Sequence, residues 1–172
     1  LFPGLRLGYV VGAPALLAAL ARSRAIASQQ PSLLDQMAVA ELLAGDVLER
    51  HVRRVRRRNA ERLRATLAAL EATMPAGARF REPCGGTSVW VELPGGVDCD
   101  ALAAAAWQRG IVYGQGDLFR LDGEGAPALL LSFAGLAPDA IRAGVSELAA
   151  LVRRQGVRPR RSAVRRVARR VR

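Results

Sequence analysis

The sequence is most unusual for what it lacks: it contains no lysine, and all 26 of its positively charged side chains are arginines. No side chain therefore offers an amine that could form an imine with a carbonyl compound. Cysteine is also scarce, because Cys84 and Cys99 are the only two. Two cysteines cannot build a disulfide framework, and their spacing is not that of zinc ligands. We expect reduced thiols, no metal site and a cytoplasmic location.

Histidine is rare, and long apolar segments are missing. The single histidine, His51, has no histidine partner for a metal cluster and cannot complete a catalytic triad by itself. We expect it to be a solvated or helix-packing residue. The longest uncharged stretch near the start, residues 7–21, is too short to span a bilayer and contains Gly12 and Pro14. No membrane partner is therefore expected.

The net charge of +11 is concentrated in one segment. Residues 153–172 hold ten of the 26 arginines and no acidic residue, so that 16 arginines face 15 acidic residues in the rest of the chain. We expect a disordered basic tail over 154–172. The alternatives are an amphipathic helix on an anionic surface and electrostatic binding to DNA, with the tail as the main functional segment of a protein without cofactor. Five further arginines between residues 53 and 58 predict a solvated helix face, with a dimer or domain contact as the alternative.

Apolar spacing and capping residues predict five helices. They cover residues 15–26, 33–44, 46–73, 99–109 and 138–153. Ser32 with Asp35 resembles a capping box, and Asp98 can cap the fourth helix. Gly45 and Gly110 follow helices as C-terminal glycines do. The third helix is far longer than the average helix and is expected to link two structural units.

Short apolar runs between turn residues predict five strands. They cover residues 5–11, 78–82, 87–93, 111–113 and 128–133. In the third run, Val89 and Val91 alternate with Ser88 and Trp90, as expected of a strand with two different faces. Strands and helices mingle along the chain, so the predicted class is α/β with an α+β C-terminal part.

Four segments, in order, resemble the class I/II aminotransferases, which are fold-type I pyridoxal-phosphate proteins. The segment PGLRLGY resembles the one that follows the Schiff-base lysine of that family. PCGGTSVWVELP resembles its Pro-x-Gly-Gly strand, GIVYGQGDLF its Gly-Val strand and loop, and LLLSFAGL the strand in which many members carry Arg-Ile-Ser-Phe-Ala. These segments are residues 3–9, 83–94, 110–119 and 129–136.

One branch of the family resembles the chain most. Residues 33–67 are similar to the stretch of MocR-type regulators that has a Gln-x-Ala helix followed by Arg-His-x-Arg-Arg. Those proteins join an N-terminal winged helix-turn-helix of the GntR kind to an aminotransferase-like domain. The resemblance implies a homodimer that senses pyridoxal phosphate or a small amino compound and binds DNA through a domain outside this chain.

The resemblance also implies particular site residues. Arg6 matches the arginine that contacts the cofactor phosphate, and a guanidinium group suits phosphate because it is permanently charged and donates two parallel hydrogen bonds. The alternative is an arginine at a strand edge that pairs with an acid. The family's Ser-Lys pair would lie just before Leu1, so we expect a C-terminal fragment. No catalytic residue is expected in this chain, because the Schiff-base lysine is absent.

Leu130 departs from the family pattern. It occupies the position at which typical aminotransferases bind the substrate carboxylate with an arginine, and leucine cannot bind a carboxylate. The departure favours a sensor over an active transaminase.

The resemblance divides the chain into three parts before the tail. Residues 1–45 are expected to be the end of the large cofactor-binding domain, 46–74 the linking helix, and 75–153 the small C-terminal domain. The expected function is that of the effector-sensing domain of a MocR-type regulator. The alternative is part of an active class I/II aminotransferase, which exchanges amino groups between amino acids and 2-oxo acids.

Overall fold

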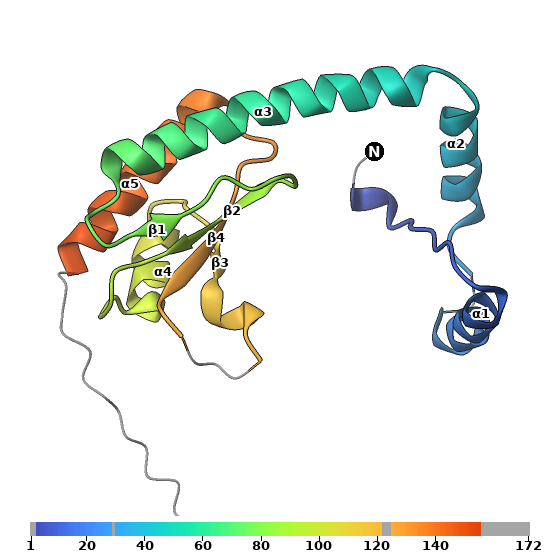
Figure 1. The fold of residues 1–172 in the computed structure, drawn as a ribbon, viewed down its shortest axis with the longest axis horizontal. Coiled ribbons are helices and arrows are strands. Elements are labelled where there is room, and N and C mark those ends of the chain that lie inside the picture. The colour runs from blue at the N-terminus through green and yellow to red at the C-terminus, as the bar shows by residue number, and fades with distance from the viewer. Residues whose placement is uncertain (1–2, 29, 122–124, 156–172) are drawn as a thin grey trace, which may run out of the picture. The chain divides into compact units, whose positions relative to one another are not determined.

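The computed structural model describes residues 3–28, 30–121 and 125–155 (Figure 1). The chain divides between Arg57 and Arg58 into two compact units, each described separately below. A disordered tail is predicted for residues 154–172. Residues 156–172 lie outside the described part of the chain, so this prediction is not tested. The predicted boundaries of the large domain, linking helix and small domain also stay predictions.

The N-terminal unit, up to Arg57, consists of helices. A short 3-10 helix, Pro3–Leu5, precedes α1, Pro14–Ser28, and α2, Leu33–Ala44. Ser32 caps α2 as predicted: its hydroxyl oxygen accepts a hydrogen bond from the backbone N–H of Asp35 at 3.3 Å. Neither α1 nor α2 has a buried residue. These two helices therefore form no hydrophobic core within this unit.

Helix α3, Val47–Thr73, is 27 residues long and contributes residues to both units. Its buried residues all lie in the second half: Ala65, Thr66, Ala69 and Leu70. The hydroxyl of Thr66 is satisfied inside the helix, because it donates to the carbonyl oxygen of Arg62 at 2.8 Å. The long helix predicted over 46–73 is thus confirmed.

The C-terminal unit, from Arg58, is built on an antiparallel sheet of four strands in the order β1-β2-β4-β3 (Figure 1). The strands are β1, Arg79–Phe80; β2, Ser88–Glu92; β3, Gly114–Gln115; and β4, Ala128–Ser132. The central pair, β2 and β4, aligns Trp90 with Leu130 and Val91 with Leu129. Because neighbouring residues of a strand point to opposite faces, this register separates an apolar face from a mixed one.

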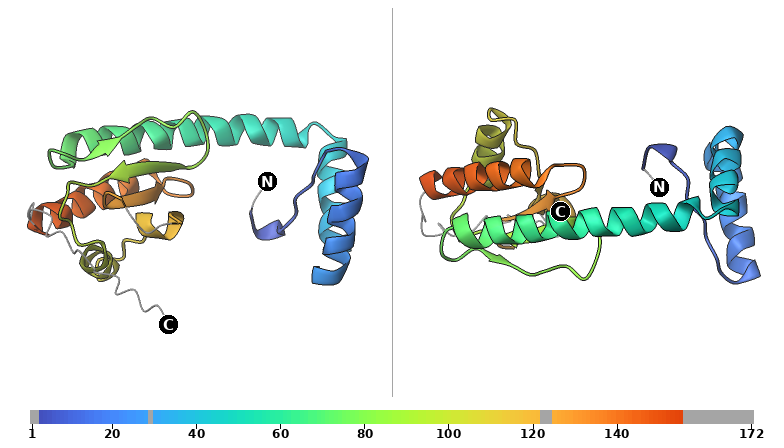
Figure 2. Two further views of the ribbon diagram at one scale, coloured as in Figure 1. Left: turned by 60° about the horizontal axis from the view of Figure 1, so that its bottom comes forward. Right: turned by 90° about the horizontal axis from the view of Figure 1, so that it is seen from above.

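The apolar face packs against three helices. Val89, Val91 and Leu129 are fully buried together with Leu70 of α3 and Leu148 of α5. Helix α4 is Cys99–Trp107 and helix α5 is Pro138–Gln155. Figure 2 shows α5 lying alongside the C-terminal part of α3 in both views. The single core of this unit thus lies between the sheet and these helices.

Polar contacts fix the ends of these helices. The carboxylate of Asp98 accepts hydrogen bonds from the N–H groups of Asp100 and Ala101 at 3.1 and 3.0 Å, which confirms the predicted cap of α4. Arg109, just after α4, forms a 2.6 Å ion pair with Glu147 of α5. The first contact stabilises the start of α4, and the second ties its end to α5.

Two predicted strands are wrong. Residues 5–11 form no strand: Arg6 has a φ of 51°, in the left-handed region that a β-strand excludes. All the strands in the described part of the chain belong to the C-terminal unit, so these residues pair with none of them. Residues 111–113 are also irregular, and the strand next to β4 begins only at Gly114. Apolar runs this short do not determine pairing.

The remaining elements agree with the predictions. The five helices and the strands at 87–93 and 128–133 are present, and the strand predicted at 78–82 is shortened to Arg79–Phe80. Gly45 ends α2 in an extended conformation rather than the left-handed one typical of a C-terminal glycine. The structure thus has the mixed helix and sheet architecture expected of the α/β class. Among the described residues, no helix combines the length and the apolarity that crossing a membrane requires.

Candidate functional site

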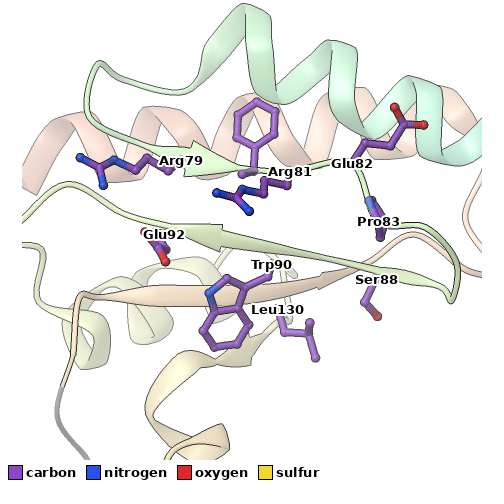
Figure 3. Close-up of a pocket in the computed structure, with 9 residues that line it drawn as sticks. Arg79, Arg81, Glu82, Pro83, Ser88, Trp90, Glu92 and Leu130 are labelled. Atoms are coloured by element: carbon purple, nitrogen blue, oxygen red, sulfur yellow. The ribbon is translucent and has the colours of Figure 1, made fainter.

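The mixed face of the sheet carries the main candidate site. Ser88, Trp90 and Glu92 alternate with the core residues of β2, and Leu130 lies directly opposite Trp90 on β4. A hollow of about 670 Å³ extends over this face to β1 (Figure 3). Its lining consists of Arg79, Phe80, Arg81, Glu82, Pro83, Ser88, Trp90, Glu92 and Leu130. This volume falls within the range of small-molecule sites.

An aromatic pair borders the hollow. The rings of Trp90 and Phe119 meet edge to face, with their centroids 6.1 Å apart. Phe119 reaches this position because Gly114 has no side chain: a Cβ on Gly114 would lie 2.9 Å from Cε2 of Phe119 and 3.3 Å from Cβ of Leu130. Trp90, Phe119 and Leu130 together form an apolar surface.

Charged groups lie at the rim near β1. Arg79 is aligned directly with Glu92 of β2, so the two side chains point to the same face of the sheet. Arg81 follows two residues later and lines the hollow as well. Figure 3 shows Glu82 directed away from Trp90 and Leu130. The hollow therefore combines an apolar surface with guanidinium groups at its edge.

The structure places Leu130 in the middle of the mixed face, with Trp90 of β2 on one side and Gly114 of β3 on the other. A hydrophobic side chain here can pack but cannot hold a carboxylate. The family resemblance pointed to this position, whereas no prediction from the sequence included Arg79 and Arg81, which line the same hollow. Their spacing of two residues in a predicted strand was the available signal.

Arg6, the predicted phosphate-binding residue, belongs to the N-terminal unit. It is exposed, and it is the only residue other than glycine with a positive φ in the described part of the chain. Such a backbone conformation costs free energy and is found preferentially at functional positions. Its guanidinium group makes no hydrogen bond or ion pair with the described residues, so its donors are available to an anion.

The residues present fit pyridoxal phosphate in part. Arg6 can supply donors to the phosphate, whereas the sequence has no lysine that could attach the cofactor covalently. No group of three or more His, Cys, Asp or Glu side chains gathers in the described residues. His51 lies half-buried on α3.

The hydroxyl of Tyr113 and the thiol of Cys99 are neighbouring titratable groups of the C-terminal unit. The hydroxyl of Tyr113 is buried and has no hydrogen-bond partner among the described residues. Burial raises the pKa of Tyr113 to about 12, and the neighbouring Cys99 acts in the same direction. Burial also raises the pKa of Cys99 above its ordinary value. Cys99 therefore lacks the lowered pKa of a reactive thiol.

Comparison with known proteins gives a consistent picture. The family model of aminotransferase class I and II matches residues 1–148. The 2-aminoadipate transaminase of Thermus thermophilus is 36% identical over 148 residues, which are 86% of this chain and 37% of that protein. The probable rhizopine catabolism regulatory protein MocR of Rhizobium meliloti is 26% identical over 148 residues, 86% of this chain and 30% of the regulator.

A solved structure shares the arrangement. The alpha-aminoadipate aminotransferase LysN from Thermus thermophilus, complexed with N-(5'-phosphopyridoxyl)-L-leucine, matches with a TM-score of 0.82 at 35% identity over 89% of this chain and 39% of that chain. The chain thus spans less than two fifths of the length of each of these relatives.

Proposed function

Because this chain belongs to the aminotransferase class I and II family, we propose that it serves as part of a pyridoxal-phosphate-binding domain that senses a small amino compound in a MocR-type transcriptional regulator. The observation that carries this proposal is the position of Leu130 in the centre of the mixed sheet face. The aminotransferases that this chain resembles typically have an arginine at that position. A sensor needs differential binding of its ligand but no turnover.

The family relationship supports both the cofactor and the regulatory role. The curated relatives include MocR itself and an uncharacterized HTH-type regulator of Bacillus subtilis that is 27% identical over 153 residues. The lysine needed for covalent attachment would come from the part of the protein outside these 172 residues. The protein would act as a homodimer, with DNA bound by a separate domain.

In this proposal the residues of the chain have separate tasks. Arg6 would hold the phosphate of the cofactor through its permanently charged guanidinium group. The hollow beside Trp90 and Leu130 would accommodate the amino compound. Pyridoxal phosphate, when bound, supplies an electron sink for bonds at the α-carbon of such a compound.

An active aminotransferase is the second candidate, and one observation favours it. The identity of 36% to a 2-aminoadipate transaminase is higher than the 26 to 30% found for the regulators. Under this hypothesis, a residue other than Leu130 must bind the substrate carboxylate.

The test uses the product of the whole reading frame that contains this chain. We expect an encoded winged helix-turn-helix, an internal lysine that reacts with pyridoxal phosphate, and binding of promoter DNA that changes when a small amino acid is added. Arg6→Gln should weaken cofactor affinity about tenfold or more, since it removes a charge-assisted contact. Sustained conversion of amino acid to 2-oxo acid, without DNA binding, would instead establish the aminotransferase.

A further inference from the structure

The hollow on the mixed sheet face has an apolar part and a charged part. Its inner part is apolar, because Trp90 and Leu130 lie opposite each other there, and Phe119, beside the hollow, contacts the indole ring of Trp90 edge to face. A carboxylate placed there would lose its hydration without finding a donor. The inner part therefore suits an aromatic or aliphatic group.

The rim toward β1 has the opposite character. Arg79 and Glu92 are cross-strand neighbours of opposite charge, so an acidic side chain lies directly opposite Arg79 on the same face of the sheet, although no ion pair joins the two within the described residues. Arg81 follows the paired residues of β1 and has no acidic residue aligned opposite it; like Arg79, it makes no hydrogen bond or ion pair within the described residues. Glu82, its neighbour in sequence, is directed away from the indole (Figure 3). Of the two guanidinium groups at the rim, Arg81 is thus the one without a carboxylate directly opposite it, and it is open to an anion.

The two parts are close enough for one small molecule. Arg81, Trp90 and Leu130 line the same hollow of about 670 Å³, and Ser88 adds a hydroxyl donor on the same face. A guanidinium group binds a carboxylate through two parallel hydrogen bonds, which fixes the orientation of the bound molecule.

Resting on the proposed function, we infer that the hollow binds a monocarboxylate with an aromatic or long aliphatic body, whose carboxylate contacts Arg81 and whose body covers Trp90 and Leu130. Arg81 takes over the task that Leu130 cannot perform. Dicarboxylates are disfavoured, because their second carboxylate would meet the apolar inner part.

The test is a titration of the 172-residue chain with 3-phenylpropanoate, without pyridoxal phosphate. Labelling tryptophan with ¹⁵N gives two indole signals, from Trp90 and Trp107, and the variant Trp90→Phe assigns them. We expect the Trp90 signal to shift in a saturable manner while that of Trp107, which lies in α4, stays in place. The neutral 3-phenylpropanamide and the dicarboxylate glutarate should bind more weakly.

Variants separate Arg81 from its neighbours. Arg81→Gln should weaken binding of 3-phenylpropanoate about three- to tenfold at this exposed site but leave the amide unaffected. The matched control Arg79→Gln removes the same group two positions earlier on the same rim and should change the affinity less than about twofold. Arg81→Lys should restore part of the affinity.

The inference is overturned if the acid and the amide bind equally, if Arg81→Gln has no effect, if glutarate binds best, or if the Trp90 signal does not respond. A failure of this inference can be distinguished from a failure of the proposed function. Loss of cofactor binding by the whole protein would refute the sensor but not the carboxylate site, whereas an unresponsive hollow would leave the cofactor experiment unaffected.

Discussion

Single side chains decide the chemistry of the sheet face. Leucine at position 130 leaves the middle of this face without a charge, and glycine at 114 leaves room beside it for Phe119. Both residues make the surface apolar, and together they leave the cationic part of the site at the rim of the sheet.

The buried Tyr113 should make the stability of the fold depend on pH in the alkaline range. Burial raises its pKa to about 12, while the unfolded chain has the ordinary value of about 10. Below pH 10 the phenol of Tyr113 keeps its proton in both the folded and the unfolded chain, so its titration does not lower the free energy of unfolding there. Between pH 10 and 12 the unfolded state loses its proton first, so the free energy of unfolding falls as the pH rises.

The variant Tyr113→Phe removes this titration and the unpartnered hydroxyl. We expect its stability at pH 8 to equal or slightly exceed that of the wild type, because no satisfied hydrogen bond is lost. Its stability should decline less between pH 10 and 12. Urea unfolding at several pH values measures both, and identical pH profiles would show that Tyr113 is not buried as described.

The elements of the C-terminal unit depend on one another through close packing. The edge strand β3 has only two residues, and the glycine that begins it allows Phe119 to lie against β4. Strand β2 is held on both sides, by β1 and by β4. The candidate site is therefore a property of the assembled sheet rather than of one loop.

Gly114→Ala tests this packing. The added methyl group would collide with the ring of Phe119 and press on Leu130, so we expect a loss of about 1–3 kcal/mol in the free energy of unfolding and an altered near-UV circular dichroism signal from Trp90. Gly85→Ala is the matched control, because a Cβ there meets nothing within 4 Å. It should change stability by less than about 0.5 kcal/mol. Equal effects of the two variants would contradict the proposed role of Gly114.

At the scale of the whole molecule, the two units differ in how they bury apolar side chains. The hydrophobic core belongs to the C-terminal unit together with the second half of α3. In the N-terminal unit, Tyr9, Val11 and Ile26 are at least 85% exposed, and α1 and α2 bury nothing. Such surfaces are typical of segments that are covered by other parts of a protein or by a partner.

The absence of lysine predicts how this chain reacts with pyridoxal phosphate. The 172-residue chain, mixed with pyridoxal phosphate and reduced with borohydride, should gain no cofactor mass on any internal side chain, because it contains no lysine. Mass spectrometry of proteolytic fragments measures this. An adduct on the N-terminal amine is the internal control for the reagent, whereas an adduct on an internal residue would contradict the prediction.

The sequence by itself determined most of the local structure. Caps at Ser32 and Asp98 and the alternation of β2 concern neighbours in the chain, and all three were predicted because the forces that produce them act over a few residues. The resemblance of four motifs likewise identified the family, which the family match then confirmed. The absence of lysine also followed from the sequence alone.

Only the tertiary structure decided which strands pair and which side chains meet. Residues 5–11 have the composition of a strand, yet they form none, because a strand needs a partner for its backbone hydrogen bonds. In the same way, Arg81 and Leu130 are separated by 49 positions in the sequence but line one hollow. The pairing of β2 with β1 and with β4 brings these residues together, and their positions in the sequence do not predict which strands pair.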